Sequence, residues 1–336
     1  MAIKVGINGF GRIGRLVFRL GMKNPEFDFV GVNDITGAEN LAYLLKYDST
    51  HGVLEKDVKV ENDELIVAGD RFKVFAIKNP KDIPWKELGV DIVIESTGIF
   101  RSRDKAAKHL EAGAKKVILT APGKGEPPDF TAVLGINEEH YDPKNHNVIS
   151  NASCTTNCFG PMVKVLNDNF KIKKGFMTTI HAYTNDQRLM DTPHKAMRRG
   201  RAAAYSIIPT TTGAAKAIVL VMPEFKNKLD AISIRVPVID GSLVDFVCEV
   251  EKSTTVEEIN EAFKNASEGA FKGLIQYSKD PLVSVDIIGN SHSLVFDSLE
   301  TKMLGDNFIK LVGWYDNEYG YASRVVDLAK YIGERL

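Results

Sequence analysis

The sequence has little of several features that would assign it to a special class of protein. Its three cysteines in 336 residues are too few, and odd in number, for a disulfide framework, and no set of Cys and His residues has the spacing of a zinc site. No apolar run approaches the roughly 20 residues that a membrane helix needs, and the chain begins with a strand-like run instead of a signal peptide. A formal net charge of -1 provides no overall attraction to nucleic acid. We therefore expect a cytoplasmic protein without a metal or a membrane partner.

A chain of this length suggests two domains. In its first half, short apolar strands alternate with helical segments, which predicts a Rossmann-type doubly wound α/β domain over residues 1–152. Turn residues within 57–76 predict an antiparallel excursion there. The predicted elements are strands at 2–8, 27–33, 90–95 and 116–120 and helices at 11–22 and 103–111.

The pattern changes near residue 150, where long strand candidates begin to dominate. This predicts a second, α+β domain over residues 153–317, built on a mostly antiparallel sheet, followed by a terminal helix over 318–336. The predicted strands are 175–183, 229–236, 242–250 and 307–315, and the predicted helices are 154–167 and 255–267.

The segment Gly9-Phe10-Gly11-Arg12-Ile13-Gly14 matches the G-x-G-x-x-G pattern and lies between a predicted strand and a predicted helix. Glycines let the backbone approach a pyrophosphate, and the helix N-terminus attracts its charge. Asp34 ends the next predicted strand, where its carboxylate can bind a ribose 2′-hydroxyl and repel a 2′-phosphate. The alternative is a tight turn that only packs a helix onto a sheet, but the context favours a site for NAD over NADP.

Cys154 lies in the first turn of a predicted helix, after the candidate N-cap Ser153. A helix N-terminus stabilises a thiolate. His181 ends a predicted strand and could act as the acid and base beside such a nucleophile. Taken alone, each of the two residues is more often structural. Cys158, one helical turn beyond Cys154, is interpreted as structural because it lies further from the helix end.

Three segments are candidates for binding anions. Thr210-Thr211-Thr212-Gly213 precedes an apolar helical run and could bind a phosphate or simply cap the helix. The cluster Arg198, Arg199 and Arg201 lies in a long irregular segment, where a solvated face, a subunit contact or nucleic-acid binding are all open. Arg235 lies within an apolar run, which favours a specific anionic partner.

Around Cys154 the chain resembles the glyceraldehyde-3-phosphate dehydrogenase family, and the resemblance covers nearly the whole sequence. The matching segments are Ile7-Asn8-Gly9-Phe10-Gly11-Arg12-Ile13-Gly14-Arg15, Leu45-Lys46-Tyr47-Asp48-Ser49, Ser153-Cys154-Thr155-Thr156-Asn157-Cys158, His181-Ala182-Tyr183-Thr184, Arg235-Val236-Pro237 and Trp314-Tyr315-Asp316-Asn317-Glu318-Tyr319-Gly320-Tyr321.

The resemblance implies roles for these residues. Cys154 is the nucleophile that forms a thiohemiacetal and then a thioester, and His181 is its base. The implied phosphate-binding residues are Ser153, Thr155, Thr184, Arg199, Thr212, Gly213 and Arg235. The implied NAD contacts are Gly9, Gly11, Arg12, Ile13, Gly14, Asp34, Lys78, Thr120 and Asn317. The family also implies a homotetramer, with residues 185–205 at a subunit interface and the terminal helix returned to the first domain.

The resemblance leads us to expect phosphorylating oxidation of glyceraldehyde 3-phosphate with NAD, a step of glycolysis and gluconeogenesis. An erythrose-4-phosphate dehydrogenase would share nearly all of these residues. A non-catalytic, NAD-responsive RNA-binding protein is a further alternative, based on the arginine cluster 198–201. Thr192 stands where the family usually has a leucine near the adenosine ribose, which leaves some tolerance of NADP open.

Overall fold

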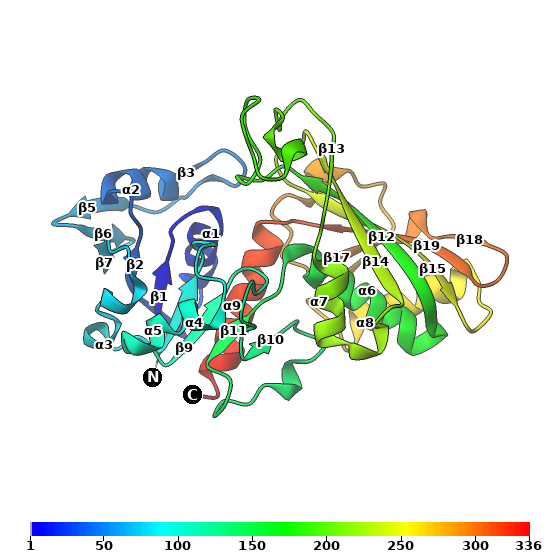
Figure 1. The fold of residues 1–336 in the computed structure, drawn as a ribbon, viewed down its shortest axis with the longest axis horizontal. Coiled ribbons are helices and arrows are strands. Elements are labelled where there is room, and N and C mark those ends of the chain that lie inside the picture. Colours follow the sequence, from blue (N-terminus) through cyan, green and yellow to red (C-terminus); the bar gives the residue numbers. More distant parts are fainter. Residues whose placement is uncertain (1) are drawn as a thin grey trace. The chain divides into compact units, whose positions relative to one another are not determined.

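The computed structural model describes residues 2–336, which form two compact units (Figure 1). The first unit contains the chain up to Ala132, the segment Glu139–Ala152 and the terminal segment Ala322–Leu336. The second contains Val133–Glu138 and Ser153–Tyr321. Each unit has its own large sheet, and the two are described separately below.

The first unit is built on a nine-stranded sheet in the order β10-β11-β9-β8-β1-β2-β7-β6-β5. The pairs from β10 to β7 are parallel, whereas β5, β6 and β7 are joined by antiparallel turns, as predicted. The strands are β1 (Ile3–Asn8), β2 (Phe27–Asn33), β5 (Val58–Glu61), β6 (Glu64–Val67), β7 (Asp70–Phe75), β8 (Ile92–Glu95), β9 (Lys116–Leu119), β10 (Phe130–Thr131) and β11 (Val148–Ser150), beside a small pair, β3 (Tyr47–Asp48) and β4 (Gly52–Val53).

The helices of this unit are α1 (Arg12–Gly21), α2 (Ala38–Lys46), α3 (Trp85–Leu88), α4 (Arg103–Ala106) and α5 (Lys108–Glu111). The single helix predicted over 103–111 is wrong, because the structure has two short helices that meet at Ala107. The amide of Leu110 bonds to the carbonyl of Ala107, which is a tighter turn than that of an α-helix.

The second unit is built on an eight-stranded sheet in the order β13-β14-β12-β15-β19-β17-β16, with β18 paired to β19. It is mostly antiparallel, as predicted, but β12 runs parallel to β14 and β16 runs parallel to β17. The strands are β12 (Ile172–Ala182), β13 (Ile208–Thr210), β14 (Leu229–Val236), β15 (Ser242–Val250), β16 (Ile275–Ser278), β17 (Leu294–Asp297), β18 (Lys302–Leu304) and β19 (Phe308–Tyr315).

Helices α6 (Cys154–Phe170), α7 (Ala214–Val221) and α8 (Val256–Glu268) pack against this sheet (Figure 1). Helix α6 contacts β12, β15, β17 and β19 and contributes Phe159, whose ring packs edge-to-face on Phe246 of β15. Along β12, buried Met177 alternates with exposed Phe176, because successive strand residues point to opposite faces. One face of the sheet is therefore the core of this unit, and His181 at the end of β12 lies on that buried face.

The last helix, α9 (Tyr319–Gly333), begins in the second unit, and its residues from Ala322 onward belong to the first. Short 3-10 helices occur at Pro80–Asp82, Glu138–His140, Met197–Gly200, Pro223–Phe225, Ser284–Ile287 and Ser298–Glu300. Within residues 2–336, no helix combines the length and the apolar character needed to cross a bilayer.

Candidate active site

Cys154 is the first residue of α6, and the local sequence explains why the helix starts there. The Ser153 hydroxyl accepts a hydrogen bond from the Thr156 amide at 3.1 Å, which is the N-cap that the sequence predicts. Ala152 has a left-handed backbone with φ 52°, which is costly for a residue with a Cβ. This turn directs the chain into α6 and carries no recognisable sequence signal.

His181 brings an imidazole to the thiol. Its Nε2 lies 3.4 Å from Cys154 Sγ, and its Nδ1 lies 2.7 Å from the Ala182 carbonyl oxygen. A carbonyl can only accept, so the Nδ1–H tautomer donates to Ala182 and leaves the lone pair of Nε2 facing Sγ. The arrangement therefore suits proton transfer from the thiol to the imidazole.

Arg235 adds a positive charge to this pair. Its Nη1 donates to the Ala182 carbonyl at 3.0 Å and also lies 2.8 Å from His181 Nδ1. In the Nδ1–H tautomer this second contact joins two N–H groups and is not a hydrogen bond, so the Ala182 carbonyl is the shared acceptor of both. Burial and the Arg235 charge lower the pKa of His181 to about 3, so the imidazole is neutral beside a protonated thiol and can accept a proton. Once the thiolate forms, its charge favours the imidazolium.

The thiol itself is subject to opposing effects. Burial raises the pKa of Cys154, while Arg235 and hydrogen bonds from Thr155 lower it. The prediction from the sequence relied on the helix N-terminus, which favours the thiolate, and on His181 as a partner, and did not include the effect of burial on the pKa of the thiol. Because burial favours the protonated thiol, a neighbouring base would help to form the thiolate, and His181 is placed to be that base.

The other two cysteines lie in the core. Cys158 is fully buried, with its Sγ directed at the Gly313 carbonyl, and burial raises its pKa well above the usual value. Burial likewise raises the pKa of Cys248 to about 12. All three thiols are free, and only Cys154 is partly exposed.

Tyr315, at the end of β19, is a site residue that the sequence did not single out. Its hydroxyl bonds to Thr155 at 2.9 Å and to Thr179 at 2.8 Å, and its ring packs edge-to-face on His181. It therefore joins the first turn of α6 to the strand that carries His181. Thr155, a predicted phosphate contact, has its hydroxyl engaged in this bond, and its role stays a prediction.

Asn317 is linked to the same strand through Ser242. The Ser242 hydroxyl donates to Asn317 Oδ1 at 2.5 Å and accepts from the Ala182 amide at 3.0 Å. Since Oδ1 already accepts this bond, the Nδ2 donors of Asn317 are directed elsewhere. Asn317 was predicted from the resemblance, whereas Ser242 was not.

The other predicted anion-binding residues lie at the start of α7 and in the segment after β12. Arg199 is ion-paired with Asp186 and donates to the Thr210 hydroxyl at 2.9 Å. The Thr212 hydroxyl accepts from the Ala214 amide at 3.2 Å, but the N-cap of α7 is Gly213, so the predicted threonine N-cap is not found. Gly213 has open space where a Cβ would lie. The remaining predicted residue is Thr184, whose backbone N–H donates a hydrogen bond to Gln187 Oε1.

In the first unit, the glycine turn between β1 and α1 has no room for a side chain at two of its three glycines. A Cβ on Gly9, whose φ is 90°, would meet Thr97 N at 2.7 Å, and a Cβ on Gly14 would overlap Gly9 O. A Cβ on Gly11 would meet nothing within 4 Å. The turn is therefore closed on the protein side and open where a pyrophosphate would approach, which fits a dinucleotide.

The other predicted cofactor residues follow the ends of strands in this unit. Asp34 accepts the Phe10 amide at 2.8 Å, which ties the acidic residue to the glycine turn. Arg12 is ion-paired at 2.6 Å with Asp48, a buried carboxylate that the sequence did not assign. Lys78 is exposed, and Thr120 donates to the Glu95 carbonyl at 3.3 Å. Ile13 is half-buried in the first turn of α1.

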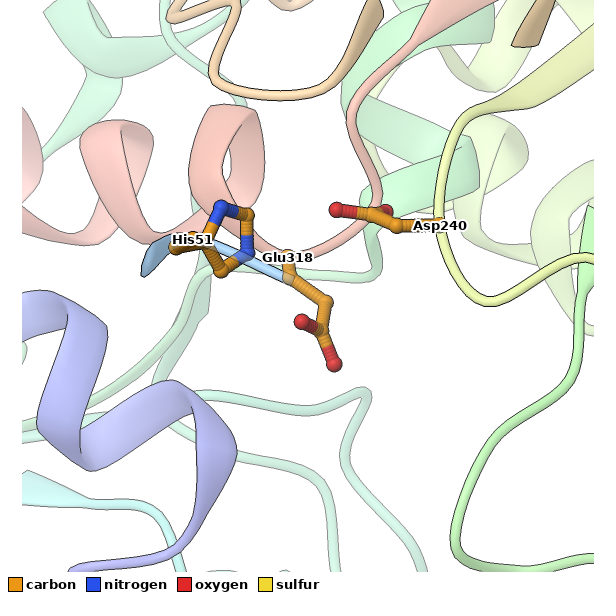
Figure 2. Close-up of side chains that lie close together, drawn as sticks. All are labelled: His51, Asp240 and Glu318. Atoms are coloured by element: carbon orange, nitrogen blue, oxygen red, sulfur yellow. The ribbon is translucent and has the colours of Figure 1, made fainter. Parts of the chain in front are cut away.

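Figure 2 draws two carboxyl side chains of the second unit, Asp240 and Glu318, together with His51 of the first unit. Asp240 precedes β15 and Glu318 precedes α9. Burial and the neighbouring Asp316 raise the pKa of Asp240 to about 9, so its carboxyl is protonated at neutral pH. Asp240 is two residues before Ser242 in the sequence.

Comparison with known proteins agrees with this geometry. A family model described as glyceraldehyde 3-phosphate dehydrogenase, NAD binding domain, matches residues 3–103. A second, described as glyceraldehyde 3-phosphate dehydrogenase, C-terminal domain, matches residues 153–317. The chain is 58% identical over 335 residues to glyceraldehyde-3-phosphate dehydrogenase of Geobacillus stearothermophilus, covering 100% of this chain and 99% of that protein. It is 56% identical to glyceraldehyde-3-phosphate dehydrogenase 1 of Bacillus subtilis, with the same coverage.

Proposed function

Because the chain belongs to the glyceraldehyde-3-phosphate dehydrogenase family, it is an NAD-dependent oxidoreductase of glyceraldehyde 3-phosphate, and we propose that Cys154 and His181 carry the reaction. The observation that supports this most is the 3.4 Å contact between Cys154 Sγ and His181 Nε2. It brings a nucleophile and a neutral base together at a helix N-terminus.

The reaction begins with attack of the Cys154 thiolate on the aldehyde carbon, which gives a thiohemiacetal. The Cys154 amide at the start of α6 and protonated His181 stabilise the oxyanion. His181 then gives its proton to the oxyanion, which becomes the hydroxyl of the thiohemiacetal, and the neutral imidazole accepts that proton back as the hydride leaves. NAD, when bound, would accept the hydride. The Nδ1 contact with Ala182 keeps the imidazole oriented through both transfers.

The product on Cys154 is a thioester, which retains the oxidation energy. Inorganic phosphate attacks its carbonyl carbon and releases the acyl phosphate 1,3-bisphosphoglycerate and the Cys154 thiolate. We assign the two phosphate groups to Ser153, Thr155, Thr184, Arg199, Thr212, Gly213 and Arg235. Two half-buried guanidinium groups, Arg199 and Arg235, provide the positive charge that this assignment needs.

We assign NAD binding to residues 1–152 and catalysis to residues 153–317, with 318–336 as a helix of the NAD-binding domain. The glycine turn, Asp34 and Arg12 support the first assignment. Lys78, Thr120 and Asn317 complete the proposed contacts. Asn317 would hold the nicotinamide carboxamide, which agrees with the bond from Ser242 that orients its side chain.

We also propose a cytoplasmic homotetramer. Residues 185–205 form an irregular segment with exposed apolar side chains, which favours a subunit contact over a solvated face. These side chains are Leu189, Met190, Met197 and Tyr205. Exposed Phe176 and Ile232 on the outer face of the second sheet support a further contact. Three free thiols agree with a reducing compartment.

The test is NADH formation from glyceraldehyde 3-phosphate with and without inorganic phosphate, compared with erythrose 4-phosphate. We expect strict dependence on phosphate and a preference for the triose. Cys154→Ser should abolish turnover, because a hydroxyl is a far weaker nucleophile and leaving group than a thiol in this chemistry. Full turnover by that variant would contradict the mechanism, and preference for the tetrose would favour the sister enzyme.

A further inference from the structure

A buried hydrogen-bond network lies under the glycine turn of the first unit, and no role has been assigned to it. We propose that Glu95, at its centre, is the positioning residue of the dinucleotide site. Glu95 ends β8 and is buried, although a carboxylate is rarely found at such a position without partners. This inference rests on the proposed NAD site and deepens it.

Both oxygens of the Glu95 carboxylate are occupied by donors. Oε2 accepts from Asn8 Nδ2 at 2.5 Å and from His109 Nε2 at 3.0 Å. Oε1 accepts from the Thr97 amide at 2.9 Å and from the Thr97 hydroxyl. Four donors on one buried carboxylate make a fully satisfied network, which fixes the geometry of the elements that supply them.

The proton on His109 is fixed by the residue on its other side. Trp85 Nε1, which can only donate, lies 3.0 Å from His109 Nδ1. His109 Nδ1 must therefore accept, and in the neutral ring Nε2 carries the hydrogen that Glu95 receives. Both side chains are fully buried, so water cannot replace either bond.

The network continues across the carboxyl ends of the parallel strands. The Oδ1 of Asn8 accepts from Asn33 Nδ2 at 2.7 Å, and Asn33 in turn holds the backbone N–H and C=O of Ile77 at 2.8 and 2.9 Å. On the other side, the Glu95 carbonyl accepts the Thr120 amide at 3.0 Å. One connected set of bonds thus reaches the ends of β1, β2, β8 and β9 and the segment after β7.

The position of each member in the sequence shows what the network holds. Asn8 immediately precedes Gly9, Asn33 precedes Asp34 and Ile77 precedes Lys78. Three proposed cofactor segments therefore start one residue after a group that the network holds, and a fourth residue, Thr120, is bonded directly to the Glu95 carbonyl. Ser96, next to Glu95, also bonds to the Gly9 carbonyl at 2.5 Å. Glu95 thus aligns separate loops before the dinucleotide binds, which reduces the ordering cost of binding.

The substitution that tests this is Glu95→Gln. The amide keeps the shape but replaces one acceptor with a donor, which must face either Thr97 N–H or His109 Nε2–H. Leaving a buried donor unpaired has a cost that corresponds to about a tenfold change in an equilibrium constant. We expect the Kd for NAD, measured by isothermal titration calorimetry, to rise about tenfold. In steady state, the change should appear in KM for NAD rather than in kcat.

A remote variant and a matched control make the test specific. Trp85→Phe removes the donor that fixes His109 without altering any proposed cofactor segment, and it should weaken NAD binding about threefold. Lys116→Met removes a buried group of the same sheet, bonded to His146 O at 2.9 Å and Asn147 Oδ1 at 2.8 Å, at the amino end of β9. It should lower the unfolding midpoint without changing the Kd for NAD.

The outcomes separate the inference from the proposed function. Titration of NAD needs no substrate, so it can be interpreted even if the protein does not oxidise the triose phosphate. Weaker NAD binding by E95Q and W85F, but not by K116M, supports the positioning role. An unchanged Kd in E95Q, or equal weakening by K116M, overturns it. If E95Q does not fold, an unchanged Kd in W85F overturns it instead.

Discussion

His109 and His181 are both buried and both have partners at the two ring nitrogens, yet their surroundings prepare them for opposite tasks. His109 lies between an obligate donor, Trp85, and a carboxylate, so the hydrogen of its neutral ring lies on Nε2. His181 lies between a carbonyl and a thiol, and a thiol can give up its proton. The first arrangement fixes the orientation and the tautomer of the ring, whereas the second permits proton transfer.

The two units differ in the same way. In the first, the carboxylate of Glu95 is saturated with donors and lies beneath the proposed ligand site. In the second, Arg235 lies beside His181, and burial together with the Arg235 charge lowers the pKa of His181. Burial of polar groups therefore does not identify chemistry by itself. The informative feature is whether the partners leave a proton free to move.

The largest expected effect comes from removing the base that would accept the Cys154 proton. His181→Asn deprives Cys154 of its base, so acylation should slow by roughly 10²–10⁴-fold, the usual contribution of general base catalysis. We also expect the pKa of the Cys154 thiol to rise, because no imidazolium can form beside the thiolate. Stopped-flow measurement of the first turnover and thiol alkylation across neutral pH test both effects. Alkylation that does not change with the substitution would refute the pairing.

The next effect tests the ligand-holding unit. Asp34→Gly removes the carboxylate that would repel a 2′-phosphate and also its bond to the Phe10 amide. The ratio of kcat/KM for NAD to that for NADP should fall by about tenfold, the size of one favourable polar interaction. Asp28→Gly, which removes an exposed carboxylate of β2, the strand that precedes Asp34, is the control and should leave the ratio unchanged. An unchanged ratio in the Asp34 variant would contradict the assignment of Asp34 to the ribose 2′-hydroxyl.

The smallest effect concerns stability and not turnover. The pKa of Asp240 is raised to about 9 in the folded protein, so its contribution to stability is fully present below about pH 4 and is lost as pH rises through 9. Asp240→Asn replaces the protonated carboxyl with a permanent donor. Relative to the wild type, this variant should gain about 1 kcal/mol or more of unfolding free energy between pH 5 and pH 8.

Urea unfolding at the two pH values measures this difference. Asp230→Asn, at an exposed carboxylate of β14, is the control and should shift by the same small amount at both. A parallel pH dependence of the Asp240 variant and the wild type would show that the acid is not protonated in the folded protein.

Local features of the site could be predicted from the sequence because they depend on residues that are close together in the chain. The Ser153 cap, the glycine turn and the exact limits of β14 and β15 follow from capping residues, glycine spacing and strand alternation. The family matches confirm that both halves have the fold of glyceraldehyde-3-phosphate dehydrogenase and that the protein uses NAD. The assignments of individual site residues stay predictions.

The residues that the sequence missed act through contacts between distant segments. Tyr315 reaches Thr155 across 160 positions, and Glu95 meets Asn8 across 87. Glu95 was visible only as a charged residue at the end of an apolar strand, and Ser242 as the first residue of a predicted strand. Nothing local to either residue indicates its partner. The break at Ala107 was missed for the opposite reason, since helix periodicity continues through it.

The contrast among the three cysteines has a practical consequence. Cys158 and Cys248 are enclosed in the core and hold their protons strongly, whereas Cys154 is the thiol that a reagent can reach. A spectroscopic label directed at sulfur would therefore attach once per chain, at the reacting atom, in the unmodified protein. The fold thus provides a single natural reporter position without any engineered cysteine.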